Sequence, residues 1–307
     1  NVVQALRGLT GFEAESVLLT GIVQNGCLSD DVIPVIVREK AQIIRKSGVL
    51  EFYDQSVSMT EVGGLQNLKQ YAAEVRSAFS KEAAAHGVDT PKGVLLVGVP
   101  GTGKSLSAKA IAGGKMPLLR MDIGALMGGL VGQSEGNMRQ ALKTAEAVAP
   151  CVIWIDEIEK GLGGIGGGEH DGGTSQRVFG TLLTWMQETT APVYVVATAN
   201  DVRSLRPELI RRFDDVFWVD LPDRESRREI LKLHLAKRGY DVLPESGTDQ
   251  IITFLHGFSG AEIEKVVKSA IKTAYFEGVK LTTSHLLAAS RQIVPVAVTM
   301  DRQIDEL

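Results

Sequence analysis

The glycine-rich segment GVPGTGKS, residues 98–105, is the part of the chain whose residue types point most directly to chemistry. It fits the pattern G-x-x-x-x-G-K-[ST], in which glycines allow backbone N–H groups to turn toward phosphate oxygens. An apolar run at 93–97 precedes the segment and a helix-forming run at 106–112 follows it. We expect Lys104 to reach the β- and γ-phosphates of a nucleotide and the hydroxyl of Ser105 to ligate Mg²⁺.

Two carboxylates and an amide end other apolar runs. Asp156 and Glu157 end the run that begins at Cys151, and Asn200 ends the run that begins at Val193. We expect Asp156 to hold Mg²⁺, usually through water, beside the phosphate-binding segment. Glu157 would orient and polarise the attacking water as a general base. Two roles are open to Asn200: it holds the same water, or it senses the γ-phosphate.

The apolar runs alternate with helical patterns, which predicts an α/β fold with a parallel sheet and helices on both faces. The expected strands are residues 93–97, 118–122, 151–157, 193–200 and 216–219. A single helix is expected over 66–86 and another over 135–148. Ligands collect at the carboxyl ends of parallel strands, so the glycine segment, the acidic pair and Asn200 should meet at one edge of the sheet.

Composition and charge exclude several classes of protein. Of the 307 residues, 44% are hydrophobic and 23% are charged, which is typical of a soluble globular protein. The net charge of −4 argues against nucleic-acid binding, and no apolar run is long enough to span a bilayer. Cys27 and Cys151 favour two free buried thiols in a reducing, cytosol-like compartment. Because residue 1 is Asn, we expect the chain to begin partway into a longer protein.

The start of the chain resembles a later segment. Residues 6–18, LRGLTGFEAESVL, align without gaps on residues 255–267, LHGFSGAEIEKVV. Each copy has the pattern of an N-capped amphipathic helix, followed by a second helix at 29–45 or at 282–292. The similarity is either a coincidence between two helices that share a capping pattern or the mark of an upstream module related to the last part of the chain.

Together these segments resemble the AAA family of ATPases. Residues 98–105 are similar to its Walker A motif, 155–157 to Walker B, 198–200 to sensor 1 and 257–262 to the motif of its lid domain. Val62-Gly63-Gly64-Leu65 is similar to the family's linker into the ATPase domain, which borders the adenine. The resemblance covers residues 61–292, and it is strongest to a group encoded in cyanobacterial genomes and some algal plastids that carries a degenerate upstream module.

The resemblance implies how the chain is divided and which residues contact the nucleotide. It implies the helical end of an upstream module at 1–49, a linker at 50–60, an α/β ATPase domain at 61–222 and a helical lid domain at 223–307. The implied nucleotide-binding residues are Val62, Gly63, Gly98, Pro100, Gly101, Thr102, Gly103, Lys104, Ser105, Leu106, Gly260 and Ala261. The last two stand where some relatives carry a nucleotide-sensing Arg.

The resemblance also implies a ring, usually a hexamer, in which a cation from one subunit meets the γ-phosphate bound by its neighbour. Arg211 and Arg212 match the family's arginine-finger segment. Relatives separate the two arginines by a short insert, whereas here they are adjacent. Either could be the finger, and we favour Arg211 because the upstream residue is the better attested finger in similar proteins.

Two loops bear on the work that such a ring would do. Relatives that thread polypeptides carry an aromatic residue before Val-Gly in the first pore loop, where this chain has Leu130. The second loop, residues 161–173, is rich in glycine and has little intrinsic structure. It contains His170 between two acids, but no second His or Cys lies at ligand spacing, so a solvated loop is favoured over a metal site.

The favoured hypothesis is a ring ATPase that hydrolyses Mg-ATP to ADP and phosphate and remodels a protein partner, in the cytoplasm or a plastid stroma. The alternative is a slowly hydrolysing scaffold that switches conformation with ATP. A small-molecule kinase would need an acceptor pocket, for which the sequence gives no sign. The presence of both Glu157 and Asn200 favours the ATPase over the scaffold.

Overall fold

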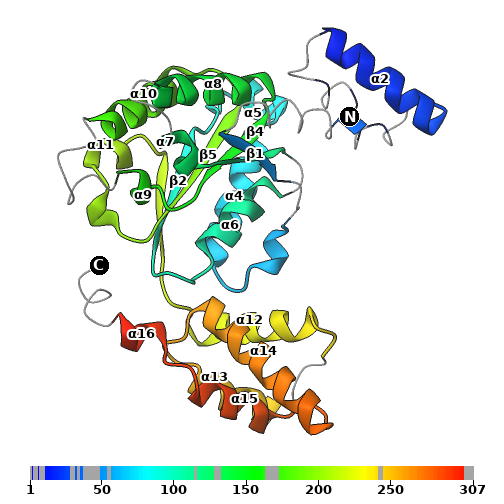
Figure 1. Ribbon diagram of the computed structural model, residues 1–307, viewed down its shortest axis with the longest axis vertical. Helices are drawn as coiled ribbons and strands as arrows, with labels where there is room; N and C mark the ends of the chain where they lie inside the picture. Colours follow the sequence, from blue (N-terminus) through cyan, green and yellow to red (C-terminus); the bar gives the residue numbers. More distant parts are fainter. Residues whose placement is uncertain are drawn as a thin grey trace.

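The computed structural model describes residues 2, 6, 11–27, 32, 35–36, 49–53, 57–113, 116–127, 133–162, 173–240 and 245–300. Within these residues the elements between 50 and 219 form an α/β domain, and those between 224 and 299 form a smaller all-helical domain. Figure 1 shows the helical domain below the sheet of the α/β domain.

Six strands form one sheet in the order β1-β3-β4-β5-β2-β6. Their bounds are Leu50–Tyr53 for β1, Gly93–Gly98 for β2, Leu118–Met121 for β3, Cys151–Ile155 for β4, Val193–Ala199 for β5 and Asp215–Val219 for β6. All neighbouring pairs from β3 to β6 are parallel, and only β1 runs antiparallel to its neighbour. The α/β fold with a parallel sheet is therefore confirmed.

Helices cover both faces of this sheet (Figure 1). On one face lie α4 (Gln66–Ala78) and α6 (Lys104–Ala112); on the other lie α7 (Ile123–Met127), α8 (Gln133–Ala147), α10 (Thr174–Glu188) and α11 (Pro207–Ile210). Successive side chains of a strand point to opposite faces, so each central strand contributes to both layers. On β4, for example, Ile153 belongs to one core cluster and Val152 to the other.

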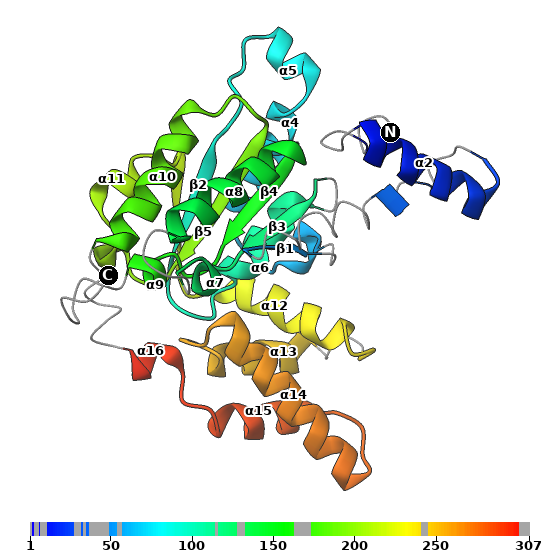
Figure 2. The ribbon, with the colours of Figure 1, turned by 45° about the horizontal axis from the view of Figure 1, so that its top comes forward.

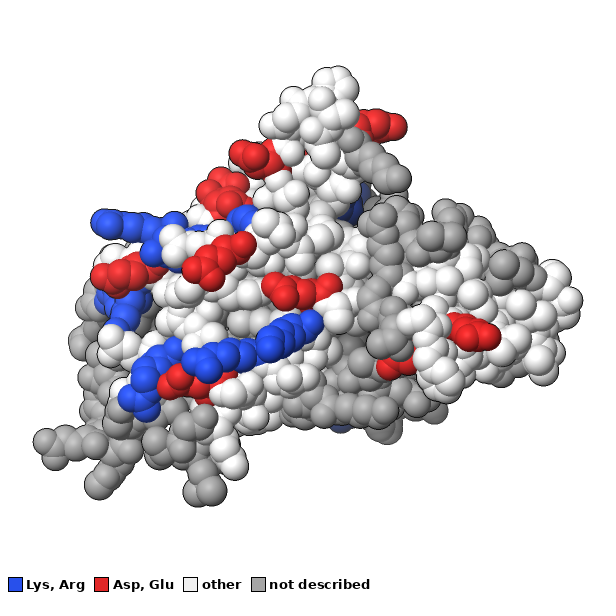
Figure 3. Space-filling view, turned by 90° about the horizontal axis from the view of Figure 1, so that it is seen from above, with Lys and Arg blue, Asp and Glu red and all other residues white. Residues whose placement is uncertain are grey.

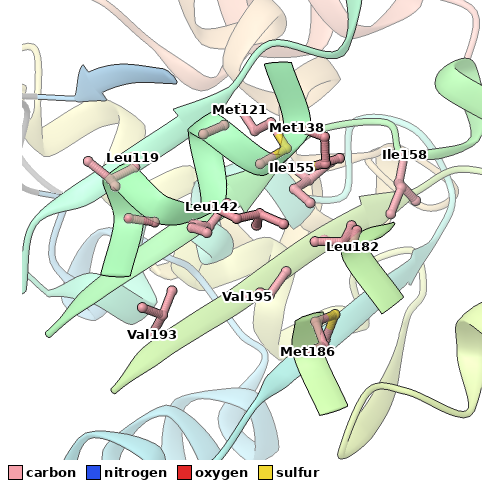
Figure 4. Close-up of a cluster of buried hydrophobic side chains, with 14 of the residues drawn as sticks. Leu119, Met121, Met138, Leu142, Ile155, Ile158, Leu182, Met186, Val193 and Val195 are labelled. Carbon is pink, nitrogen blue, oxygen red and sulfur yellow. The ribbon is translucent and has the colours of Figure 1, made fainter. Parts of the chain in front are cut away.

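The larger core cluster lies between the sheet and α8 and α10. Figure 4 shows strand and helix side chains pointing toward one another, among them Leu119, Ile155 and Val195 from the sheet and Leu142 and Leu182 from the helices. Full burial of such a side chain stabilises the fold by about 1.5–3 kcal/mol. Because the central strands are buried on both faces, their sequences are continuous apolar runs, and their ends are held firmly in register.

The all-helical domain consists of α12 (Arg224–Ala236), α13 (Glu245–Phe254), α14 (Gly260–Glu277), α15 (Thr283–Arg291) and α16 (Val296–Thr299). Figure 2 shows α14 running along the length of this domain, and its buried residues join those of α12, α13 and α15 in one core. Ser259 and Glu262 form a reciprocal capping box at the start of α14, as the sequence predicts. The cap starts α14 at Gly260.

Residues 50–60 are not the plain linker that we expected from the sequence. Leu50–Tyr53 form β1 at the edge of the sheet, and Met59–Glu61 form the short 3-10 helix η2. The side chain of Leu50 is 2% exposed and belongs to the larger core cluster. A strand of only 4 residues leaves too short a pattern to recognise, and its pairing with β3 is what makes it a strand.

The single helix expected over 66–86 is interrupted. The helices α4 and α5 (Lys81–Ala85) are separated at Ser80, whose hydroxyl accepts a hydrogen bond from the first turn of α5. Phe79 packs its ring edge-on against Tyr194 of β5, with the ring centroids 6.1 Å apart. The cap and this tertiary contact together end α4, although the helical periodicity continues through the break.

Near the start of the chain, α2 (Gly11–Asn25) begins at the residue that the internal repeat aligns with Gly260, the first residue of α14. Val17 and Gly21 lie on the face toward Val32, and a Cβ on Gly21 would come within 2.3 Å of that valine. The second helix expected at 29–45 falls almost entirely outside the described residues. The assignment of residues 1–49 to an upstream module therefore stays a prediction.

The surface carries charges of both signs. On the face in Figure 3, Lys and Arg side chains lie next to Asp and Glu side chains. None of the helices in the described ranges is long and apolar enough to cross a membrane. Cys151 is free and buried as expected, but Cys27 is free and exposed, which corrects the expectation of two buried thiols. Its position just after the end of α2 accounts for its exposure.

We expect Leu50→Ala to lower the free energy of unfolding by about 2–5 kcal/mol, because the truncation leaves a cavity in the core under β1. Glu51→Ala on the same strand is the matched control, since Glu51 is exposed and pairs with Arg120 at the surface. There we expect a loss of about 0–1 kcal/mol. Urea unfolding followed by circular dichroism measures both variants, and equal effects would contradict the place of β1 in the sheet.

Candidate functional site

The glycine-rich segment lies between β2 and α6, where the chain turns sharply. Gly98, Gly101 and Gly103 have φ angles of 149°, 80° and 100°, which side chains with a Cβ rarely adopt. A Cβ on Gly98 would also lie 2.1 Å from the carbonyl oxygen of Val219 on β6. Glycine is therefore required for the turn, and the turn leaves the N-terminus of α6 facing the cavity described below.

Lys104, the first residue of α6, is 6% exposed. Its ammonium donates hydrogen bonds to the carbonyl oxygens of Gly98 at 2.7 Å and Val99 at 2.8 Å. Burial lowers the pKa of Lys104 to about 8, and the negative charges of nearby carboxylates, that of Glu159 foremost, oppose this shift. An ammonium forms a stronger hydrogen bond with an anion than with a neutral carbonyl. A phosphate can therefore replace the carbonyl oxygens of Gly98 and Val99 as the partner of Lys104.

Asp156 connects the end of β4 to α6 and to β5. Its Oδ1 accepts hydrogen bonds from Ser105 Oγ at 2.7 Å and from Thr198 Oγ1 at 2.6 Å. The hydroxyl of Thr198 in turn accepts a hydrogen bond from the backbone N–H of Glu157 at 2.9 Å. The serine and the aspartate that we expected to share Mg²⁺ therefore touch each other, and Thr198 orients both acidic residues.

Glu157 lies at the turn from β4 into α9 (Glu159–Leu162). Its φ of 50° is left-handed, an uncommon conformation for a residue other than glycine and one that concentrates at functional sites. Its carboxylate accepts a hydrogen bond from Asn200 Nδ2 at 3.2 Å and forms an ion pair with Lys160. The expected general base and the expected sensor 1 amide are therefore in direct contact.

The helical domain contacts both the glycine segment and the residues that enter the α/β domain. The backbone N–H of Ala261, in the first turn of α14, donates a hydrogen bond to the carbonyl oxygen of Gly101 at 3.0 Å. A Cβ on Gly63 would lie 2.5 Å from the side chain of Ile230, so glycine at this position allows α12 to approach. Both contacts join residues that are far apart in the sequence.

These elements enclose a cavity of about 400 Å³ between the two domains. Of the expected nucleotide-binding residues, Val62, Gly63, Pro100, Gly101, Thr102, Gly103, Lys104, Ser105, Leu106, Gly260 and Ala261 line it, as do Glu157 and Asn200. Gly98 and Asp156 do not line it themselves, although Asp156 contacts it through Ser105. Arg211 and Arg212 are exposed and lie away from the cavity walls. Leu130 and His170 fall outside the described residues.

Several residues that line the cavity were not anticipated as site residues: Glu61, Thr198, Ile230, Leu233, His234, Lys237 and Glu264. Three of them, Ile230, Leu233 and His234, lie at helical spacing on α12, and Lys237 follows on the same spacing as its C-cap. This stripe, apolar at its start and basic at its end, was the signal available in the sequence. Burial lowers the pKa of His234, whose Nδ1 has no partner within the described ranges. Lys237 forms an ion pair of 2.7 Å with Glu61 at the rim.

The cavity fits a nucleotide with Mg²⁺. Backbone turned by positive φ at Gly101 and Gly103 suits a phosphate chain, and among the described residues the ammonium of Lys104 bonds only to carbonyl oxygens. The hydroxyl of Ser105 and the carboxylate of Asp156 form a pair of oxygen ligands of the kind that Mg²⁺ prefers. The apolar part of the wall, near Ile230, suits the flat face of a base.

Comparisons with known proteins agree with this geometry. Residues 94–221 match the family model described as the ATPase family associated with various cellular activities (AAA). The chain is 42% identical over 310 residues to the AAA domain-containing protein ycf46 of Pyropia yezoensis and 41% identical over 314 residues to that of Guillardia theta. The chain contains an AAA ATPase domain. Each alignment covers 100% of the chain.

The chain spans 63% and 61% of the length of these two relatives. In addition to the AAA domain, residues 1–47 match a second family model, described as SpoVK-like AAA ATPase, second domain. Among solved structures, the AAA domain of FIGL-1 in complex with ADP has a TM-score of 0.66 and 23% identity. That alignment covers 86% of this chain and 94% of the FIGL-1 chain, and the likeness is one of fold.

We expect the affinity of the AAA domain for ATP to fall as the pH rises above about 8, because the ammonium of Lys104 then loses the proton that attracts phosphate. The loss should approach about tenfold per pH unit, the limit for one linked proton. Calorimetric titration from pH 7 to 9.5 measures it. Lys104→Arg stays charged over this range, so its affinity should not vary with pH. A pH-independent wild-type affinity would contradict the prediction.

Proposed function

We propose that the chain is the ATP-hydrolysing part of a ring-forming ATPase, and that ATP binds with Mg²⁺ in the cavity between the two domains. The observation that carries this proposal is the meeting of Lys104, Ser105, Asp156, Glu157 and Asn200 at one edge of the sheet. Each of these groups has a distinct use in phosphoryl transfer to water, and together they form a complete set for that reaction.

The binding roles follow from charge and position. The ammonium of Lys104 attracts the phosphates, and the backbone N–H groups at the start of α6 add their partial positive charge. Ser105 and Asp156, whose side-chain oxygens are hydrogen-bonded to each other, are the residues that would hold Mg²⁺. When bound there, Mg²⁺ offsets negative charge on the phosphate oxygens. The lid contact between Ala261 and Gly101 closes the cavity over the glycine segment.

The catalytic roles belong to the two groups at the ends of β4 and β5. Glu157 takes a proton from the attacking water as its general base, and its left-handed turn aims the carboxylate at the cavity. Asn200, which donates a hydrogen bond to Glu157, holds the same water or senses the γ-phosphate. The products are ADP and phosphate.

Arginine from a neighbouring subunit completes the proposed site. Arg211 and Arg212 lie just after α11 and are both exposed, and neither forms an ion pair within the ranges that the structure describes. Since neither lines the cavity of its own chain, both are available to a cavity in a neighbouring copy. This supports assembly as a ring, for which we propose a hexamer, with Arg211 as the finger.

A second function, a slowly hydrolysing scaffold switched by ATP, is favoured by one observation. The carboxylate of Glu157 forms an ion pair with the ammonium of Lys160, which occupies an oxygen that would otherwise face the attacking water. The two proposals differ in turnover: the ATPase releases phosphate continuously, whereas the scaffold binds ATP and retains it. In both proposals the chain acts on a protein partner. We also propose that it does so in a cytosol or a plastid stroma.

We expect Glu157→Gln to bind Mg-ATP with wild-type affinity and to hydrolyse it at least ~10²-fold more slowly, because the amide cannot accept the proton from water. Lys104→Ala should abolish nucleotide binding. Phosphate release under saturating ATP measures the first effect and calorimetry the second. An exposed acid, Glu188→Gln, is the control for loss of one charge. Unchanged turnover in Glu157→Gln would contradict the assignment of the base.

For the ring, we expect Arg211→Ala to reduce turnover by about 10³-fold with nucleotide binding intact, the usual effect of removing a finger. Arg203→Ala, another exposed arginine near α11, serves as control. Mixing Arg211→Ala with Lys104→Ala subunits should restore activity, since the second variant binds no nucleotide but donates a good arginine to the first. If Arg212→Ala alone is inactive, the finger is Arg212. If Arg211→Ala and Arg212→Ala both hydrolyse ATP at the wild-type rate, this segment does not supply the arginine finger.

A further inference from the structure

Glu159 is a carboxylate that neither the sequence nor the proposed mechanism assigns to the site. It is the first residue of α9 and does not line the cavity. Its Oε1 accepts two hydrogen bonds from Asn200, one from the backbone N–H at 3.0 Å and one from Nδ2 at 3.1 Å. Its Oε2 is buried and has no partner among the residues described. The contacts of this side chain are thus directed to Asn200.

The bonds from Asn200 determine which way its side-chain amide points. Nδ2 donates both to Glu159 and to Oε1 of Glu157. Ionised carboxylates only accept hydrogen bonds, so the NH₂ end of the amide must face them. Nothing in the described part of the chain donates a hydrogen bond to Oδ1. Since Asn200 lines the cavity, Oδ1 is the side-chain atom that it has left to offer a ligand there.

Glu159 is held firmly enough to fix this orientation. The two residues before it are bonded to Thr198: the N–H of Glu157 to the hydroxyl and the N–H of Ile158 to the backbone carbonyl, each at 2.9 Å. The side chain of Ile158 is fully buried in the larger core cluster. Together with the bonds between Glu159 and Asn200, these contacts join the segment after β4 to the end of β5 at each successive residue.

We propose that Glu159 is a positioning residue for the hydrolysis reaction, an inference that rests on the function proposed above. By holding the NH₂ group of Asn200, Glu159 keeps Oδ1 turned to the cavity as a hydrogen-bond acceptor. An acceptor there binds an O–H of the water that Glu157 deprotonates, whereas a phosphate oxygen would need a donor. Of the two roles open to Asn200, the geometry thus selects the holding of water.

The test compares Glu159→Leu, which removes the acceptor, with Glu159→Gln, which keeps an Oε1 for both bonds. We expect kcat to fall about 10–100-fold in Glu159→Leu, the usual range for loss of a supporting hydrogen bond to a functional group. The KM and the Kd for Mg-ATP should agree within about twofold between Glu159→Leu and Glu159→Gln, since both variants remove the charge that acts on Lys104 and residue 159 does not line the cavity. Glu159→Gln should keep kcat within about threefold. Glu188→Leu at an exposed position is the matched control.

A double-mutant cycle tests whether Glu159 acts through Asn200. In an Asn200→Ala background, Glu159→Leu should cause no further loss of kcat, because the group that it positions is already gone. An additive loss would overturn the proposal, as would an equal loss of nucleotide affinity and kcat in Glu159→Leu. Loss of kcat in Glu159→Gln matching that in Glu159→Leu would also overturn it, since charge rather than hydrogen bonding would then matter.

Nuclear magnetic resonance of the protein without nucleotide separates this inference from the proposed function. The backbone amide and the side-chain NH₂ of Asn200 should keep their chemical shifts and slow hydrogen exchange in Glu159→Gln and lose both in Glu159→Leu. If these signals do not respond to Glu159→Leu, Glu159 does not hold Asn200, whatever the activity. If they respond as expected but the wild-type protein binds ATP without hydrolysing it, the proposed function fails and the inferred hydrogen bonds stand.

Discussion

The contact between Thr198 and the acidic end of β4 is the interaction on which the rest of the site depends. Parallel pairing places Ile155 opposite Ala197, so the next residues on the two strands, Asp156 and Thr198, lie side by side. Thr198 then binds both the Asp156 carboxylate and the backbone of Glu157. Because the strands are buried on both faces, this register is rigid, and the oxygen that Asp156 shares with Ser105 is held in place with it.

The cavity exists only because two domains approach closely. Glycine at 63 admits Ile230 of α12, and glycine at 101 leaves room for Ser259 and Ala261 at the start of α14. Larger side chains at either position would separate the helical domain from the sheet. A ligand that contacts both domains shifts the equilibrium between two arrangements of the domains. The size of the shift equals the difference in the ligand's binding free energy for the two arrangements. Under the proposed function, this is the physical route by which a bound nucleotide moves the helical domain and, through it, a partner.

The functional groups of the site already have partners within the chain. Lys104 is bonded to carbonyl oxygens, and Glu157 to Lys160 and Asn200. Burial has shifted the pKa of Lys104 to about 8, close enough to neutrality for its charge to depend on its neighbours. Polar side chains whose bonds a ligand can replace are not left without a partner when they are buried, and they remain able to bind that ligand.

The sequence alone determined the glycine segment, the acidic pair and the parallel sheet, because each depends on residues that are neighbours in the chain or on the period of a single strand. The α/β fold and the AAA domain are confirmed; the roles of the site residues stay proposals. Tertiary structure decided what depends on contacts between distant segments. The strand β1 exists through its pairing with β3, and α4 ends where Phe79 packs on Tyr194. In the sequence, Glu159 is one acid among several. It bonds to Asn200 because the sheet places the end of β5 beside the start of α9, and hydrogen bonding depends on position in space.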